Sequence, residues 1–321
     1  MRTLLIDSTN QFLRNYAVRP SLDKDGARNG GVFGMLSSLG YFCRILEPTR
    51  VILCWDGAGG SKKRRKIIPE YKHGRRAVKP ARINATYDHE YDNIEENKKK
   101  QRQRLAEYLK DLPVTEIVVE DTEADDIVAY LAGFLPDEKI IISDDKDFLQ
   151  LINKNTIVFR PTTKSLWTQK TLVAEHNIYP YNFAVAKAVV GDAGDNIKGV
   201  NRVGLITLVK WFPIMSGVDK VTIDDLIDYA NEHVKDKNGK KYQKFIDSKE
   251  LIERNYKAVQ LHDPIIGFSS IEKVHEAIEK PVGLNATAMR GKFRQDDINS
   301  LGDNFFLRFK EVILREKRGQ K

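Results

Sequence analysis

Residues 140–147 read Ile-Ile-Ile-Ser-Asp-Asp-Lys-Asp, a short β-branched apolar run that ends in carboxylates. The same arrangement occurs at residues 3–7, which read Thr-Leu-Leu-Ile-Asp, and at 51–56, which read Val-Ile-Leu-Cys-Trp-Asp. Similar apolar runs occupy residues 117–119 and 156–159. Continuous runs of this length are typical of strands buried on both faces of a parallel sheet. Amphipathic segments lie between them, so the sequence predicts an α/β fold with a central, mostly parallel sheet flanked by helices.

Acidic residues follow these runs at the point where each strand is expected to end. Asp7 and Asp56 come directly after their runs, and a third group of acids occupies residues 144–147. Because ligands of open parallel sheets bind outside the carboxyl ends of the strands, we expect these acids to converge at one edge. Three acids in residues 123–126 would join them from the start of a helix over 124–134. The helix dipole favours acids in a first turn and explains one or two of them, but not the whole set.

The expected edge gathers nine candidate metal ligands. They are Asp7, Asp56, Glu123, Asp125, Asp126, Asp145, Asp147, Asp192 and Asp195. Carboxylates packed this closely raise one another's pKa values, and divalent cations remove that conflict. An oxygen-only ligand set suits Mg²⁺, with Mn²⁺ as a substitute. Two such ions activate a water and stabilise the leaving oxygen of a phosphodiester without a nucleophilic Ser or Cys.

Several other function classes lose support. The chain contains only two cysteines, Cys43 and Cys54, which excludes a disulfide framework and a four-cysteine zinc site. The six histidines show no metal-ligand spacing, and the sequence has neither a phosphate-loop motif nor a dinucleotide-binding glycine fingerprint. No apolar run approaches the ~18 residues of a membrane helix, and the N-terminus lacks the pattern of a secretory signal. The sequence therefore predicts a cytoplasmic protein without a membrane segment.

The positive charge is concentrated in one segment. The chain carries +8, and residues 62–110 contain 16 Lys and Arg against 7 Asp and Glu, so the rest of the chain carries −1. A basic excess confined to one segment suits a polyanionic partner, although most charge runs are solvated helix faces. Roughly 50 residues between two strands is also too long for an ordinary connection. We interpret residues 58–110 as a basic insertion that contacts nucleic acid.

The pattern after residue 180 is helical. Helical spacing recurs at residues 183–190, 205–212, 223–233 and 247–261. A glycine-rich turn over residues 191–204 would present backbone N–H groups to a phosphate, although this signal is weak alone. We therefore predict an α/β core over residues 1–180, with the insertion at 58–110, and a helical domain over 181–321 that ends in a basic tail.

An ordered set of motifs resembles the structure-specific 5′ nucleases, or flap endonucleases, and within them the bacteriophage ribonuclease H and 5′–3′ exonuclease branch. The motifs are Leu4-Leu5-Ile6-Asp7, Cys54-Trp55-Asp56-Gly57, Pro69 to Arg75, Glu123-Ala124-Asp125-Asp126, Ser143 to Leu151 and Gly191 to Ile197. Each motif alone is modest, but their order and spacing over residues 1–210 are highly specific. The resemblance implies a PIN-like nuclease core, a basic arch formed by the insertion and a C-terminal helix-turn-helix.

The resemblance also implies a role for each matching residue. Asp7, Asp56, Glu123 and Asp125 resemble the ligands of a first Mg²⁺ ion. Asp145, Asp147, Asp192 and Asp195 resemble those of a second ion, with Asp126 close by. In the arch, Lys72 resembles the lysine that meets the scissile phosphate, Arg64 and Arg75 its basic neighbours, and Tyr71 a base-stacking side chain. In the turn, Gly199, Arg202 and Gly204 resemble the positions that hold the duplex backbone and a K⁺ ion.

The sequence departs from the family pattern in two places. Arg202 stands where a glycine is usual and Lys198 where the cellular enzymes have proline, which leaves the K⁺ site open. Asp144 adds an acid beside Asp145, so the identity of the strand-end ligand is also open.

The resemblance implies a Mg²⁺-dependent 5′–3′ nuclease that removes RNA primers, DNA ends and 5′ flaps from duplex DNA during replication. Expected partners are DNA and RNA–DNA duplexes with a free 5′ end, and a single-strand-binding protein or sliding clamp. The enzyme is expected to be a monomer. A catalytically inactive nucleic-acid-binding protein of the same fold is one alternative. A phosphatase-like hydrolase of small phosphoesters is another, although Asp7-Ser8-Thr9 lacks the second aspartate that an aspartyl nucleophile requires.

Overall fold

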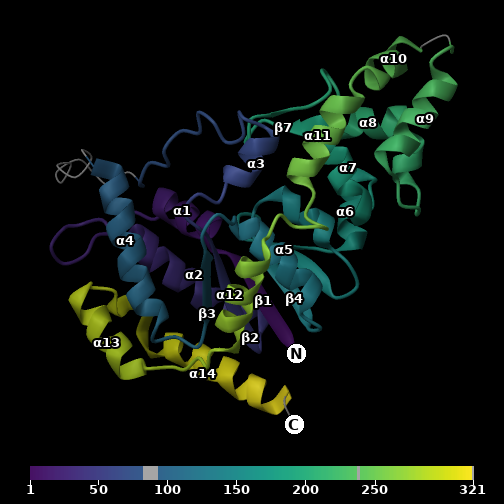
Figure 1. Cartoon of the computed structure of the whole chain (residues 1–321). Coiled ribbons are helices and arrows are strands. Elements are labelled where there is room, and N and C mark those ends of the chain that lie inside the picture. The colour runs from purple at the N-terminus through teal and green to yellow at the C-terminus, as the bar shows by residue number, and fades with distance from the viewer. Residues whose placement is uncertain (82–92, 237–238, 320–321) are drawn as a thin grey trace.

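A single six-stranded sheet forms the centre of the computed structural model, which describes residues 1–81, 93–236 and 239–319 (Figure 1). The strand order is β3-β2-β1-β4-β5-β6. The strands are β1 (Arg2–Asp7), β2 (Arg50–Asp56), β3 (Thr115–Val119), β4 (Glu138–Ile142), β5 (Thr156–Arg160) and β6 (Ser165–Trp167). Neighbouring strands are parallel except β5 and β6. The predicted α/β fold is confirmed, and β6 is an additional antiparallel edge strand that the sequence did not predict.

The central strand β1 shows why the sequence forms a sheet covered on both faces. Leu4, Leu5 and Ile6 are fully buried. Because side chains alternate along a strand, Leu4 and Ile6 enter the core on one face and Leu5 the core on the other. In register, Asp7 lies opposite Cys54 of β2, so β1 and β2 end almost level.

Two groups of helices cover the two faces of the sheet (Figure 1). The face of Leu4 is covered by α1 (Ser8–Val18), α2 (Gly30–Leu46), α4 (Ile94–Leu109), α13 (Ala286–Gln295) and α14 (Gly302–Gly319). The face of Leu5 is covered by α5 (Ala124–Phe134) and α12 (Phe268–Glu279), with α6 (Gln169–His176) and α7 (Pro180–Val190) beside them. The helices α8 (Leu205–Trp211), α9 (Ile223–His233), α10 (Lys240–Ile246) and α11 (Lys249–Val259) share this apolar core and extend from α7 away from the sheet (Figure 1).

Short elements complete the fold around the carboxyl edge. They are α3 (Lys62–Ile67), the 3₁₀ helix η2 (Lys146–Leu151) and the two-residue strands β7 (Gly191–Asp192) and β8 (Ile197–Lys198). The basic insertion thus contributes α3 and α4, whereas its residues 82–92 lie outside the part of the chain that the structure describes. Within that part, no helix has the length and apolar character needed to cross a membrane.

The C-terminal helices return to the sheet instead of staying with α7 to α11. Asp296, at the end of α13, accepts hydrogen bonds from Arg104 Nε at 2.7 Å and from Tyr108 Oη at 2.8 Å. Lys292 pairs with Asp111 at 2.7 Å. These contacts fix α13 against the base of α4. The division into domains 1–180 and 181–321 stays a prediction.

Replacing Phe309 by Ala is expected to lower the free energy of unfolding by about 3–5 kcal/mol, because this fully buried ring of α14 would leave a cavity in the core. Leu307→Ala on the same helix is the control, since Leu307 is 54% exposed and should change stability by less than about 0.5 kcal/mol. Urea unfolding measures both. Equal effects would show that α14 is not part of the core.

Candidate active site

The carboxyl edge of the sheet brings together acids from separate elements. Asp7 ends β1, Asp56 ends β2, and Asp145 follows β4. Glu123 and Asp125 lie at the beginning of α5, which packs on β1 and β2 from the same edge. The predicted convergence at one edge therefore occurs.

Hydrogen bonds fix the first of these carboxylates in place. Asp7 accepts from the backbone N–H of Asn10 at 3.1 Å and from Ser143 Oγ at 2.9 Å. Asp56 accepts from the backbone N–H of Ala124 at 2.8 Å, which ties the end of β2 to the start of α5. Each acid keeps further lone pairs that these contacts leave unused.

Glu123 lies under the basic insertion. Its carboxylate binds Lys72 Nζ, Arg64 Nη1 at 2.6 Å and Tyr71 Oη at 3.2 Å. Burial alone would raise the pKa of Glu123, but Lys72 and Arg64 hold it below its ordinary value. The lysine predicted to meet the scissile phosphate therefore lies directly among the acids.

Arg64 and Tyr71 are buried in this structure, and their contact with nucleic acid stays a prediction. Arg64 is 3% exposed and Tyr71 is 2% exposed. The guanidinium of Arg64 binds both oxygens of Asp126, at 2.6 and 2.9 Å, and donates to the carbonyl of Ala258 at 2.9 Å. Arg64 joins α3 to the core, and Tyr71 presents no ring face for base stacking.

Asp126, which is also predicted as a metal ligand, lies beside Arg64. Both of its oxygens are engaged by Arg64, and Oδ1 accepts in addition from the backbone N–H of Ile265 at 2.9 Å. The side chain is 2% exposed. Asp126 is thus the buried counter-charge of Arg64, separate from the acids that face the edge.

A second lysine, which the sequence analysis missed, bridges the remaining acids. Lys187 Nζ binds Asp147 at 2.7 Å and also binds Asp192. Asp145 Oδ1 accepts from the backbone N–H of Asp147 at 2.9 Å. Lys187 is the single charged residue in the apolar stretch of α7, Phe-Ala-Val-Ala-Lys-Ala-Val-Val, and that was the available signal.

Burial and neighbouring carboxylates together raise the pKa values of several acids at the edge. The pKa of Asp7 rises to about 7, because the side chain is buried and Asp56 and Asp145 lie nearby. The pKa of Asp147 also rises to about 7, from burial and from Asp145. Burial and neighbouring acids raise the pKa values of Asp125 and Asp145 as well. A bound cation would favour the ionised form of all four.

The carboxylates at this edge are a donor set that suits divalent cations in chemistry. Across the described residues, no three His, Cys, Asp or Glu side chains are close enough to share one metal. Lys72 and Lys187 instead neutralise Glu123, Asp147 and Asp192. Buried carboxylates with raised pKa values and only oxygen donors are the combination that Mg²⁺ or Mn²⁺ would stabilise.

Hydrogen bonds hold the predicted arch segment, Pro69 to Arg75, against the turn after α7. The backbone N–H of Lys72 donates to the carbonyl of Asp195 at 2.9 Å, and Asn196 Nδ2 donates to the carbonyl of Glu70 at 3.0 Å. Arg75 binds the Asp195 carboxylate and donates from Nε to the carbonyl of Gly194 at 3.1 Å. Arg75 is exposed, and its contact with a phosphate stays a prediction.

The three predicted residues of the helix-turn-helix differ in burial and in packing: Gly199 is in close contact with α7, and Arg202 and Gly204 are exposed. A Cβ at Gly199 would lie 2.0 Å from the carbonyl oxygen of Val190, so this glycine permits close packing on α7. Arg202 is exposed with φ of 64°, the left-handed conformation that a glycine adopts easily. Gly204 is exposed and precedes α8. Nucleic-acid and K⁺ binding by this turn stay predictions.

Asp144 and Asp145 point to different places. Asp144 accepts from the backbone N–H of Thr162 at 3.0 Å and from Thr162 Oγ1 at 2.6 Å, so it holds the turn between β5 and β6. Asp145 interacts with Asp147 and the acids of the edge. The geometry favours Asp145 as the strand-end acid of the site.

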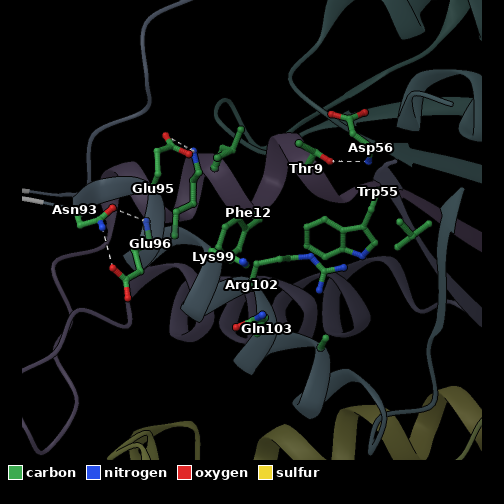
Figure 2. A pocket seen from close by; sticks show the side chains of 14 residues that line it. Thr9, Phe12, Trp55, Asp56, Asn93, Glu95, Glu96, Lys99, Arg102 and Gln103 are labelled. Atoms are coloured by element: carbon green, nitrogen blue, oxygen red, sulfur yellow. Dashed lines mark hydrogen bonds and ion pairs between the residues drawn. The ribbon is translucent and has the colours of Figure 1, made fainter. Parts of the chain in front are cut away.

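A hollow of 970 Å³ adjoins Asp56, between α1, α4 and the ends of β2 and β3 (Figure 2). Thr9 Oγ1 accepts from the backbone N–H of Asp56 at 2.9 Å at its rim. The Arg102 guanidinium lies 3.6 Å from the ring centre of Trp55 and pairs with Glu116. Arg102 thus already covers the indole that would otherwise be a stacking surface.

The family follows from comparison with known proteins. Residues 2–177 match the model of the 5′-3′ exonuclease, N-terminal resolvase-like domain. The chain belongs to this family, and the predicted resemblance to metal-dependent 5′ nucleases is confirmed.

Curated relatives and solved structures agree with that assignment. A protein named 5′-3′ exonuclease from Aquifex aeolicus is 27% identical over 82% of both chains. A protein named flap endonuclease Xni from Shewanella halifaxensis is 27% identical over 80% of this chain and 92% of its own length. A structure described as divalent zinc ions bound to the 5′-exonuclease of bacteriophage T5 has a TM-score of 0.66 at 22% identity. It covers 87% of this chain and 99% of that one, and it supports the fold.

Replacing Arg64 by Gln is expected to lower the free energy of unfolding by about 3–5 kcal/mol, because Asp126 and Glu123 would lose a buried counter-charge. Lys66→Gln is the control, since Lys66 is exposed on the same helix and should change stability by less than about 0.5 kcal/mol. Chemical denaturation gives both values. A stable Arg64→Gln protein with weakened DNA binding would instead restore the predicted contact with nucleic acid.

Proposed function

We propose that this protein is a metal-dependent 5′–3′ nuclease that hydrolyses phosphodiesters at the free 5′ end or 5′ flap of a duplex. The supporting observation is the carboxyl edge itself, where acids from β1, β2, α5 and the segment after β4 meet beside Lys72 of the basic insertion. The names of the curated relatives, 5′-3′ exonuclease and flap endonuclease, support the same activity.

We propose that two Mg²⁺ ions bind at this edge, with Mn²⁺ as a substitute. Asp7, Asp56, Glu123 and Asp125 would hold the first ion, and Asp145, Asp147, Asp192 and Asp195 the second. Asp126 is left out of this set because Arg64 engages both of its oxygens. When bound, such ions supply an activated water and stabilise the leaving oxygen, which would leave a 5′-phosphate and a 3′-hydroxyl.

The protein's own residues position the substrate and the acids. Lys72 has a φ of 54°, and its backbone N–H is fixed to Asp195, so its ammonium group is directed at the acids. There it would bind the scissile phosphate, with Arg75 beside it. Lys187 holds Asp147 and Asp192 in position from α7.

The proposed substrates are DNA and RNA–DNA duplexes with a free 5′ strand, including RNA primers during replication. A structure described as the bacteriophage T5 flap endonuclease with DNA and metal ions has a fold similar to this chain, with a TM-score of 0.67 at 22% identity. The basic charge of residues 62–110 is the feature of this chain that suits such a polyanion. A single-strand-binding protein, a sliding clamp and a monomeric state stay predictions.

Metal removal is expected to abolish cleavage without abolishing binding. A duplex with a 5′-labelled flap or nick should release short 5′ products in Mg²⁺ and none in EDTA, because hydrolysis needs the cations that the acids hold. Gel electrophoresis measures the products, and an RNA-tipped strand ranks the substrates. Tight binding with no cleavage in Mg²⁺ or Mn²⁺ would favour the inactive nucleic-acid-binding alternative.

Asp145→Asn is expected to reduce cleavage by at least roughly 100-fold while DNA affinity in EDTA changes little, since one proposed metal ligand is lost. Asp303→Asn makes the same chemical change at an exposed acid of α14 that pairs with Arg290, away from the edge. This control should cleave at the wild-type rate. Equal activity of the two variants would remove Asp145 from the active site.

A further inference from the structure

A second pocket, of 430 Å³, lies between α1, α2 and the turn that joins β5 to β6. Three cations line it: Arg14 of α1, Arg19 at the C-terminal end of the same helix, and Lys164 of the turn. No acid is among the described residues that line it. We refer to it as the Arg19 pocket.

The Arg19 pocket differs in charge from the hollow beside Asp56. That hollow is larger, but its three cations, Lys98, Lys99 and Arg102, are matched by three acids, Asp56, Glu95 and Glu96. A phosphate would therefore meet no net positive charge there, whereas the Arg19 pocket holds two cations without a carboxylate partner, and a third, Arg14, that pairs with Asp144.

Two of these cations are free of carboxylate partners. In the described chain, Arg19 and Lys164 form no ion pair, and each lies near an aromatic ring instead. The Arg19 guanidinium is 5.0 Å from the centre of Phe33, and the Lys164 ammonium is 5.9 Å from the centre of Tyr41. An aromatic ring orients a cation without neutralising it, so both charges remain available to an anion.

The pocket also has a fixed frame and neutral hydrogen-bonding groups. Asp144 holds the β5–β6 turn through Thr162, and Arg14 lies 3.5 Å from the same carboxylate. Ser37 Oγ is buried and has no hydrogen-bond partner among the described residues. A bound phosphate oxygen would accept a hydrogen bond from such a hydroxyl.

We propose that the Arg19 pocket binds a backbone phosphate of the nucleic acid, at a position away from the scissile phosphate. This inference rests on the proposed nuclease function. Asp144 pairs with Arg14 of the pocket and is adjacent along the chain to Asp145 of the acidic edge, so the two sites are neighbours. One duplex would occupy both and thereby be held in register for cleavage.

The test is DNA binding by the double variant Arg19→Gln/Lys164→Gln. Both residues are exposed, and neither belongs to the acidic edge. Affinity for a nicked duplex is measured in EDTA at several salt concentrations. We expect about tenfold weaker binding near 0.15 M salt and a log–log salt slope smaller by about two, because two phosphate contacts are lost.

The matched control is Lys273→Gln/Lys310→Gln, which removes two exposed cations from α12 and α14. It lowers the net charge by the same amount but should keep the wild-type affinity and salt slope. Thermal melting followed by circular dichroism checks that both double variants are folded. If the Arg19 pocket variant behaves like this control while the wild type binds and cleaves DNA, the pocket proposal alone is overturned. If the wild type neither binds nor cleaves, the proposed function fails with it.

A second arm separates a backbone phosphate from a free nucleotide. Thymidine 5′-monophosphate and inorganic phosphate are titrated into the wild type and the pocket variant by calorimetry. We expect no binding of either at micromolar concentration, because a single phosphate lacks the contacts that a duplex makes elsewhere. Binding of the monophosphate that the variant loses, with DNA affinity unchanged, would overturn the proposal in favour of a nucleotide site.

Discussion

Mutual repulsion among carboxylates at one edge of the sheet is the constraint on which the remaining structure depends. Parallel strands bring Asp7, Asp56 and Asp145 to that edge, and α5 adds two more acids. Burial and repulsion raise the pKa of Asp7 to about 7. Buried charge of one sign is unfavourable unless each group has a partner, so the fold supplies lysines and an arginine from distant segments.

These compensating cations explain how the separate parts of the chain are joined. Lys72 comes from the basic insertion, and Lys187 comes from α7 on the face of Leu5. Arg64 links α3 to Asp126 of α5 and to the carbonyl of Ala258 in α11. Neutralising the acids therefore also fixes the insertion and the helical region relative to the sheet. A divalent cation would compete with the lysines for the same carboxylates.

The sequence predicted strands and helices correctly where the periodicity of apolar residues follows directly from burial of one or both faces. The strand predicted at residues 140–142 is part of β4, and the helix predicted at 124–134 is α5. It did not predict that Arg64 and Tyr71 are buried, since they lie among exposed basic residues along the chain. It also missed Lys187 and the return of α13 and α14 to the sheet, because both follow from contacts between remote segments.

The order of apolar runs and acids along the chain was sufficient for the parallel sheet and its acidic edge. A strand buried on both faces requires continuous apolar residues, and parallel strands end at a shared edge, so both features follow from local sequence. Which acids pair with a cation was settled by packing in three dimensions. Desolvation and Coulomb energies depend on distances through space, and the adjacent acids Asp125 and Asp126 therefore differ: Arg64 pairs with Asp126, whereas burial raises the pKa of Asp125.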